Sequence, residues 1–360
     1  MSAGYLSNLL IKNPEVFLAE YEEVYAEGLA SSPWQHFDQT GARVGGVNYT
    51  TNVICNPLYT IYQTTRNKDR LSLSVLKVLQ NTTELEFILN SLTYELLDTF
   101  NLPAKWVNQL KLLPQQVALT EAEFNFLIDE YLSKLGSQNR SRVCESAAIA
   151  FYHQQSTIPV IKTLLCDDAP QFKLITSDLA LCWVHEGRHY KKLSPLIPYH
   201  QKLLDDFLER FWNYYRKLLA YRDSPSCEKA HQLELEFWTL FTEKTGYEQL
   251  DERKRLTALQ VLELLLVLEH PELPLHNNPA ELAARTIVQR RNISYATQTE
   301  QGTKAWDIFM LLVDTTRKLG ISFFEYISDR ISQVENIPSL GTIIRERSSE
   351  NPFGWSWIPQ

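Results

Sequence analysis

The sequence predicts an α/β protein in which a mixed β-sheet is flanked by helices and interrupted by two mostly helical insertions. The first supporting observation is a series of three short segments near the N-terminus that are rich in β-branched and aromatic residues. The second is a pair of later apolar runs, 158–166 and 179–184, which are typical of buried strands. With 360 residues, of which 44% are hydrophobic, the chain can bury a large core in one domain with insertions or in two domains.

The first 80 residues combine a helix, three strands and a second helix. Residues 14–29 have apolar positions at helical spacing, and Gly28 is expected to end this helix. Gly-Gly and Asn-Pro pairs then separate three antiparallel strands. These strands are expected at 34–44, 47–55 and 58–65. A helix over 71–79 follows, with its apolar residues on one face.

Helices are expected in most of the next segment. Residues 84–153 are predicted to be mostly helical, and Thr120 with Glu123 forms a capping box at the start of one helix. The run 158–166 is then predicted as a buried strand that ends in two acids. The second apolar run is expected to remain a strand until His185.

The last third of the chain is also predicted to be helical. Residues 203–268 carry long amphipathic helices, whose aromatic residues are expected in the core. Within them, 256–268 is predicted as one buried helix, because it is interrupted by polar residues and is shorter than the roughly 20 residues that span a bilayer. Two more helices are expected at 280–288 and 303–320, the second closed by Gly320.

Composition restricts the compartment and the mode of binding. The net charge of −8 and the pI near 5.6 exclude a protein that coats nucleic acid by bulk electrostatics, so DNA contacts must be local. The five cysteines are scattered and never form Cys-x-x-Cys, which indicates neither a disulfide framework nor a zinc ribbon. The N-terminus lacks the pattern of a secretory signal. We therefore expect a cytoplasmic protein without a membrane partner.

Three acids stand where a sheet protein gathers an active site. Asp38 lies in the first expected strand, and Asp167 directly follows an apolar run, with Asp168 as an alternative to it. Glu281 is placed one turn into a helix that Asn278 can cap. Each acid also has a simpler structural role open to it, in a turn or at a helix start. Together they match phosphoryl transfer, in which carboxylates hold Mg²⁺ ions at the scissile phosphate.

Four sequence elements surround these acids. HFDQTGARVGG contains Asp38, and TLLCDDAPQF contains the second acid. CWVHEGRHY follows shortly, and HNNPAEL with QRRNISYA contains the third acid and a basic run. The tail GTKAWDIFMLLVDTTRKLGISFFEYI closes the series. Over most of the chain these elements resemble the DDE transposases of bacterial insertion sequences, specifically the insertion sequence 66 group.

The resemblance implies an RNase H-like fold in which Asp38, Asp167 and Glu281 are the catalytic residues and the ligands of two Mg²⁺ or Mn²⁺ ions. It implies metal-dependent cleavage of DNA at the element ends, and strand transfer to target DNA by in-line phosphoryl transfer. DNA is therefore the expected partner, and a second copy of the chain is a candidate partner. The residues expected to bind DNA or to shape the site are His185, Arg188, Asn277, Asn278, Arg285, Arg290 and Arg291.

The sequence departs from the family pattern in three positions and at its start. Gln39 stands where Glu is common, His276 replaces the usual Asp, and Leu282 replaces the usual Arg, which bears on metal and DNA binding. Members of the family carry an N-terminal DNA-end-binding region, and SAGYLSNLL looks like the last piece of its recognition helix. The chain is therefore expected to be N-terminally shortened, and a separately encoded end-binding module is a candidate partner.

These expectations divide the chain into seven segments. They are a lead-in helix that remains from the DNA-binding region (1–30), three parts of the RNase H-like core (31–80, 158–190 and 276–335), two helical insertions (81–157 and 191–275) and a C-terminal tail (336–360).

Two alternative functions remain open at this point. The chain could be an inactive transposase remnant or a helical scaffold whose acids are structural. It could also be a zinc metalloprotease, because His185, Glu186 and His189 satisfy His-Glu-x-x-His. That motif must be helical, whereas here it is expected to follow a strand and contains Gly187.

Overall fold

A five-stranded mixed sheet forms the centre of the protein, in a computed structural model that describes residues 15–66 and 71–350. Its strands are β1 (Trp34–Val44), β2 (Val47–Asn56), β3 (Tyr59–Arg66), β6 (Thr163–Cys166) and β7 (Asp178–Leu181). The spatial order is β3-β2-β1-β6-β7. The first three strands are antiparallel to one another, whereas β6 is parallel to β1 and β7 is parallel to β6. The predicted mixed sheet flanked by helices is therefore confirmed.

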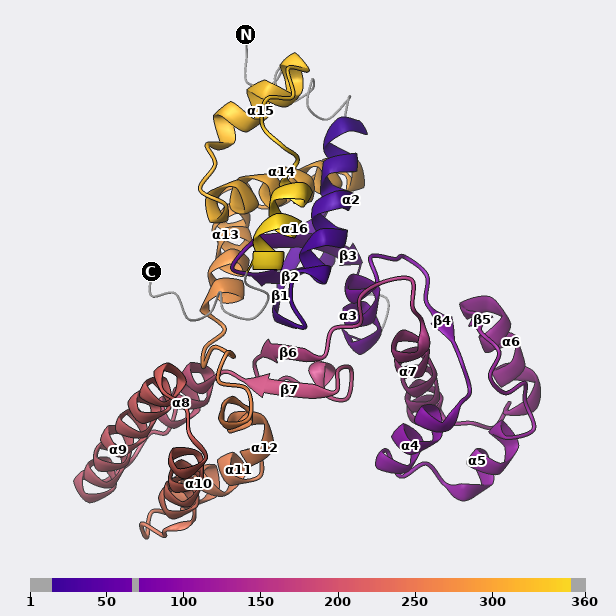
Figure 1. Ribbon diagram of the computed structural model, residues 1–360. Helices are drawn as coiled ribbons and strands as arrows, with labels where there is room; N and C mark the ends of the chain where they lie inside the picture. Colours follow the sequence, from indigo (N-terminus) through magenta and orange to yellow (C-terminus); the bar gives the residue numbers. More distant parts are fainter. Residues whose placement is uncertain (1–14, 67–70, 351–360) are drawn as a thin grey trace.

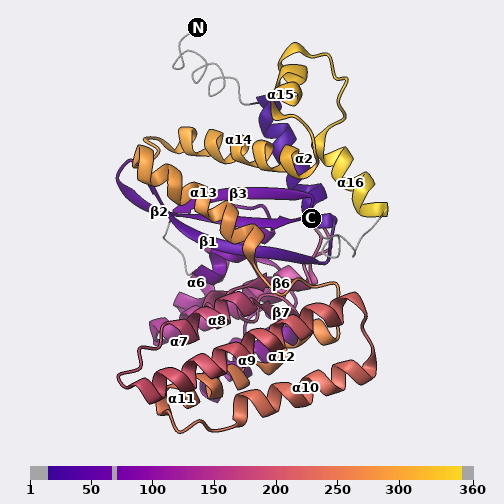
Figure 2. The ribbon, with the colours of Figure 1, turned by 90° about the vertical axis from the view of Figure 1, so that its left-hand side faces the viewer.

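Helices from both ends of the chain cover the sheet. They are α2 (Glu15–Ala30), α13 (Asn278–Ser294), α14 (Glu300–Lys318), α15 (Phe323–Ser332) and α16 (Leu340–Glu350). Of these, α2, α13 and α14 contact the strands, while α15 packs on α14 and α16 on α2. Figure 2 shows α13 and α14 crossing over one side of β1, β2 and β3. On that side Val53, Cys55 and Tyr62 are buried against Ala280 and Ala284 of α13. These small alanine side chains let the helix lie close to the strands.

Helix α14 covers the free edge of the sheet. Strand β3 has no neighbouring strand on that side, so its backbone groups need other partners. The Asp307 carboxylate accepts the Thr64 N–H at 2.7 Å, and Lys318 Nζ donates to the Tyr59 carbonyl at 2.8 Å. Side chains of one helix thus replace part of a sixth strand.

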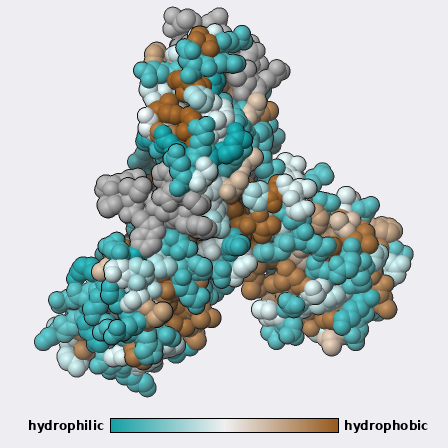
Figure 3. Space-filling view, in the orientation of Figure 1, coloured by the Kyte–Doolittle hydropathy of each residue, from teal (hydrophilic) through white to brown (hydrophobic). Residues whose placement is uncertain are grey.

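Two helical lobes extend from the sheet, as Figure 1 shows. The first contains α4 (Ser91–Thr99), α5 (Ala104–Leu110), α6 (Glu121–Tyr131), α7 (Ser137–Gln154) and the short strands β4 (Glu86–Phe87) and β5 (Leu119–Thr120), and is joined to the sheet by α3 (Leu71–Leu79). The second contains α8 (Trp183–Lys191), α9 (Pro198–Asp223), α10 (Cys227–Thr242), α11 (Glu248–Ala258) and α12 (Val261–Leu264). The first lobe shares one core with the sheet, while the second has its own. In Figure 3, apolar residues gather on the side of the α4–α7 lobe that faces the molecular centre.

Several expected boundaries are confirmed. The first three strands agree with their predicted ranges to within one residue, and α3 spans the predicted 71–79. Thr120 and Glu123 form the expected capping box of α6. Gly320 follows α14 with a φ of +69°, the left-handed conformation that a closing glycine adopts.

Other expected boundaries are wrong. The strand expected to reach His185 ends at Leu181, because Cys182 caps a helix that begins at Trp183. The single helix expected over 256–268 is broken into the end of α11, the short α12 and a turn of 3-10 helix. The first helix of the segment 84–153 begins only at Ser91, where Asn90 forms a capping box, and the short strand β4 precedes it.

Gly28 does not end its helix, since α2 continues to Ala30. A Cβ atom at this position would lie 2.6 Å from the ring of Tyr59. Tyr59 is fully buried, and its hydroxyl donates to Gln35 at 2.8 Å. Glycine is therefore required for close packing of α2 against β3, and not for a turn.

Residues 1–14, which include all of SAGYLSNLL, and residues 351–360 of the expected tail lie outside the described residues. Within the described part of the chain, no helix is both long enough and apolar enough to cross a membrane.

We predict that Gly28→Ala lowers the free energy of unfolding by about 1–3 kcal/mol, because the added methyl group overpacks a buried ring. Chemical denaturation followed by circular dichroism measures this change. Gly136→Ala is the matched control, because its methyl group would meet open space. Equal stability of the two variants would contradict the packing role of Gly28.

Candidate functional site

The parallel pairing of β1 with β6 brings two of the expected acids together. His36 of β1 lies opposite Leu165 of β6. Asp38 lies two residues after His36 in β1, and Asp167 lies two residues after Leu165, just beyond the end of β6. Neighbouring strands lie about 4.8 Å apart, so this register places the two acids side by side.

The third expected acid comes from α13, which packs across β1. Glu281 and Asn277 are four residues apart and therefore lie on the same helix face. That face and the middle of β1 enclose a pocket of about 350 Å³. The pocket is lined by Asp38, Gln39, Thr40, Asp167, His185, Arg188, Asn277, Glu281, Ala284, Arg285 and Val288. The structure thus places all three expected acids, Asp38, Asp167 and Glu281, in this one acidic pocket.

The electrostatics of the pocket bear mainly on Asp38. Burial, together with the neighbouring carboxylates of Asp167 and Glu281, raises the pKa of Asp38 from 3.8 to about 6, against the lowering effect of the Gln39 N–H. That N–H donates to Asp38 Oδ1 at 2.8 Å. The Gln39 N–H and the positive charge of Arg188 therefore balance the negative charge of the Asp38 carboxylate only in part.

Two arginines stand at the pocket. Arg188 of α8 donates to Glu281 Oε2 at 2.6 Å, and nearly half of the Arg188 side chain is exposed. Arg285, one helical turn beyond Glu281, also lines the pocket and is exposed. Positive charge therefore lies beside the carboxylates, at the opening where a phosphate could enter.

Asn277 fixes the start of α13 to β1. Its Nδ2 donates to the Phe37 carbonyl at 2.8 Å, and its Oδ1 lies 3.0 Å from His36 Nδ1, which donates to it. The Asn277 N–H donates to Cys182 Sγ at 3.2 Å. The following residue, Asn278, is the first residue of the helix rather than its expected cap.

Sequence reasoning missed His36. Its side chain is buried, and burial lowers its pKa to about 3, so the imidazole is neutral. His36 and Asp38 alternate with Phe37 along β1 and therefore share a face. This period-two spacing was the available signal, because any residue two positions from a site acid in a strand points the same way.

Asp167 and Asp168 face different neighbours. Asp167 lines the acidic pocket, whereas Asp168 lies 3.4 Å from His185 Nε2 and 3.4 Å from His189 Nε2. The two histidines are one turn apart on α8, with their rings 5.0 Å apart. Consecutive residues of an extended chain point in opposite directions, which accounts for the difference.

The segment His185–His189 is helical, contrary to the expected strand context. Glu186, however, is turned away from the two histidines into the second lobe. Its carboxylate accepts from Arg253 Nη2 at 2.7 and 2.9 Å and from the Thr257 hydroxyl, and the residue is buried. A metalloprotease needs this glutamate beside the metal-bound water, so the arrangement does not favour that alternative.

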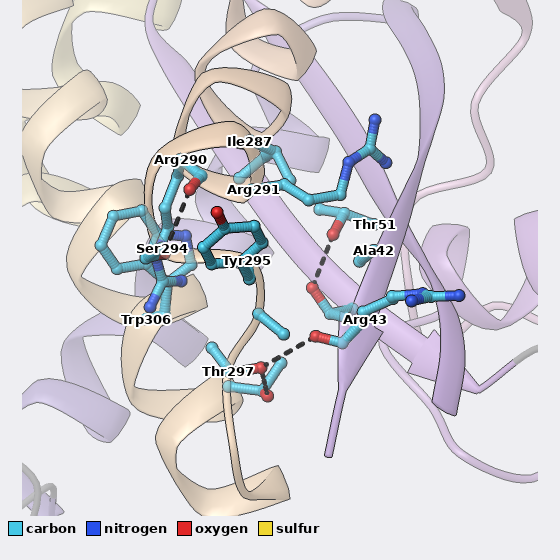
Figure 4. A pocket seen from close by; sticks show the side chains of 13 residues that line it. Ala42, Arg43, Thr51, Ile287, Arg290, Arg291, Ser294, Tyr295, Thr297 and Trp306 are labelled. Carbon is cyan, nitrogen blue, oxygen red and sulfur yellow. Dashed lines mark hydrogen bonds between the residues drawn. The ribbon is translucent and has the colours of Figure 1, made fainter. Parts of the chain in front are cut away.

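A second, smaller pocket lies along α13, the helix that also carries Glu281. Arg43, Arg291, Tyr295 and Trp306 are among its lining residues, and its volume is about 40 Å³ (Figure 4). The Arg290 guanidinium stacks on the Trp306 ring at 3.3 Å from its centroid, while Arg291 donates to the Gly41 carbonyl. Figure 4 shows Arg43 and Arg291 extending to the same side, away from Trp306.

Of the three residues that depart from the family pattern, Gln39 lies at the acidic pocket, whereas His276 and Leu282 do not line it. Gln39 donates to Asn52 Oδ1 at 2.6 Å. Leu282 is 59% exposed on the outer face of α13.

The fold and the pocket define an α/β protein in which carboxylates from the middle of β1, from the residue after β6 and from α13 gather in one pocket on a mixed sheet. A family model described as "Transposase IS66 family" matches residues 154–305. An uncharacterized protein, y4jO, from Sinorhizobium fredii (strain NBRC 101917 / NGR234) is 30% identical over 308 residues, which cover 84% of this chain and 93% of that protein. No solved structure matches the chain. The chain belongs to the IS66 transposase family.

We predict that Asn277→Ala lowers the free energy of unfolding by about 2–4 kcal/mol, because it removes two hydrogen bonds and leaves the buried His36 N–H unpaired. Denaturant titration of the purified protein measures the loss. The neighbouring Asn278→Ala should change stability by less than about 0.5 kcal/mol, as expected for a half-buried residue at a helix start. A small effect of Asn277→Ala would show that this link does not hold α13 in place.

We predict that Asp38→Asn stabilises the metal-free protein at pH 7.5 by on the order of 1–3 kcal/mol. The folded state raises the pKa of Asp38, so the folded protein binds more protons than the unfolded chain, and wild-type stability falls as pH rises from 3.8 to about 6. The advantage of the variant should therefore grow through this window and vanish below it. Thermal unfolding in EDTA across pH measures this gap, and a gap independent of pH would contradict the assignment.

Proposed function

We propose that this chain is the catalytic core of a DNA transposase that cleaves element ends and joins them to target DNA by in-line phosphoryl transfer. The observation that carries the proposal is the gathering of Asp38, Asp167 and Glu281 in one pocket. Membership of the IS66 transposase family supplies the substrate, DNA. In this proposal the three acids are catalytic and also hold two Mg²⁺ or Mn²⁺ ions.

The sheet supports an RNase H-like fold for this core. Three antiparallel strands are followed, after a helical lobe, by two strands parallel to the first. When the five sheet strands are numbered by their order along the chain, they lie side by side in the order third, second, first, fourth and fifth. This order and these directions are those of an RNase H-like sheet, with α13 laid across the site.

The pocket residues fit a divalent cation. Carboxylate oxygens are the ligands that Mg²⁺ and Mn²⁺ prefer, and three of them come from three different elements. The pKa of Asp38, raised to about 6 by burial and by its acidic neighbours, indicates a charge that a cation would stabilise. When bound, such ions polarise the scissile phosphate and activate the attacking water or 3′-hydroxyl.

The chain's own residues orient these groups and the DNA. The Gln39 N–H holds the Asp38 carboxylate, and the Ala169 N–H donates to Asp167 Oδ1 at 3.1 Å. Arg188 positions Glu281 through their ion pair. We further propose that Arg188 and His185 contact phosphate and that Asn277 and Asn278 shape the site at the start of α13.

The basic residues along α13 support a path for DNA next to the acidic pocket. Arg285 lines the acidic pocket, and Arg291 lies two turns further along the helix at the smaller pocket. Arginine binds phosphate through bidentate hydrogen bonds and needs no overall positive charge of the protein. Arg290 would support this path mainly by its packing on Trp306. A second copy of the chain and a separately encoded end-binding module remain proposed partners.

We predict that Asp167→Asn lowers Mg²⁺-dependent cleavage of duplexes carrying the element ends by roughly a thousandfold, since metal-bound charge contributes several kcal/mol and each 1.4 kcal/mol is tenfold. Asp38→Asn and Glu281→Gln should act similarly. Single-turnover cleavage and strand-transfer assays, with an end-binding module supplied, measure the loss. The matched control is Asp206→Asn, an exposed acid on α9.

A second measurement separates an inactive remnant from an incorrect site. Mn²⁺ binding, followed by electron paramagnetic resonance, should be present in the wild-type protein and lost in Asp38→Asn. Binding without any cleavage would favour the inactive remnant. Unchanged Mn²⁺ binding in all three acid variants would overturn the site.

A further inference from the structure

We propose that Asp168, His185 and His189 form a binding site for one transition-metal ion of the zinc type, next to the acidic pocket, which His185 also lines. The three residues offer three ligand atoms that all lie within 4.8 Å of one another. The inference does not depend on the proposed DNA chemistry.

The backbone brings these residues together from two rigid elements. His185 and His189 are one turn apart on α8, so their side chains lie on the same helix face. Asp168 comes from the turn that follows β6, directly after Asp167. The side chains of His185, His189 and Asp168 are 23%, 21% and 29% exposed, respectively. All three are therefore partly shielded but accessible to a small ion.

The two nitrogen–oxygen distances match the ligand spacing of a tetrahedral metal site and lie at the long end for hydrogen bonds. Both histidine Nε2 atoms lie 3.4 Å from an oxygen of the Asp168 carboxylate. N–H···O hydrogen bonds usually measure about 2.7–3.2 Å, so these contacts are long for direct bonds. With Zn–N near 2.0–2.1 Å and Zn–O near 2.0–2.2 Å, neighbouring ligand atoms of a tetrahedral site lie about 3.4 Å apart.

The donor set distinguishes this site from the acidic pocket. Two imidazole nitrogens with one carboxylate oxygen suit Zn²⁺ and similar ions, whereas the carboxylates of Asp38, Asp167 and Glu281 suit Mg²⁺ or Mn²⁺. Adjacent residues of one turn, Asp167 and Asp168, would therefore serve different ions.

The position of the site would let a bound ion link the second lobe to the sheet. Helix α8 belongs to the core of the second lobe through Trp183 and Tyr190, while Asp168 follows a strand of the sheet. An ion at this point would join the lobe to the sheet beside Asp167. Glu186, the residue that would activate a metal-bound water in a protease, is engaged with Arg253 and Thr257 on another side of α8.

The test is Zn²⁺ binding by the chelator-stripped full chain, in excess Mg²⁺, measured by isothermal titration calorimetry. We expect one Zn²⁺ per chain, a higher melting temperature with Zn²⁺, and visible absorption of a tetrahedral ion when Co²⁺ replaces Zn²⁺. Asp168→Asn and His189→Ala should each lose this binding and the thermal shift. Circular dichroism of the metal-free variants confirms that they fold.

Two controls locate the ion. His231→Ala, which removes an exposed histidine on α10, and Asp167→Asn should both bind Zn²⁺ like the wild type. Absence of Zn²⁺ binding, or binding that survives both Asp168→Asn and His189→Ala, overturns the proposal. Loss in Asp167→Asn with retention in His189→Ala would place the ion in the acidic pocket and would also overturn it.

Discussion

The parallel pairing of β1 with β6 is the interaction on which the arrangement of the pocket depends. These strands are separated by more than 100 residues, including the whole α4–α7 lobe, yet their register sets Asp38 beside Asp167. Asn277 adds the third element, because its side chain bonds to both His36 and the Phe37 carbonyl. One amide thus sets how α13 crosses β1 and where Glu281 lies.

Gathering three carboxylates has an electrostatic cost that the fold only partly offsets. The Gln39 N–H and Arg188 favour ionised carboxylates, but burial and mutual repulsion still raise the pKa of Asp38. Such imbalance is common in sites built for a charged ligand. Elsewhere in the protein, the buried carboxylate of Glu186 is paired with Arg253. The Asp307 carboxylate caps the edge of β3, and burial raises its pKa to about 7 against the lowering effect of its hydrogen bonds to Thr64.

The turn after β6 connects two chemically different environments. Asp167 lines the acidic pocket with Asp38 and Glu281, whereas Asp168 faces two imidazoles on α8. His185 borders both, so α8 contacts the sheet at the same place where the proposed ions would bind. The second lobe, although its core is separate, therefore contributes directly to the site through His185 and Arg188.

The sequence by itself determined the elements whose signals are local. The first three strands, the capping box of α6 and the glycine after α14 depend on neighbouring residues, and so does the choice of Asp38, Asp167 and Glu281 as candidate site acids. Tertiary structure alone decided what depends on distant residues. Gly28 is needed because of the Tyr59 ring, and His36 gains its partner from α13. The choice between Asp167 and Asp168 follows from strand register, which pairing across the sheet sets and no short window of sequence contains.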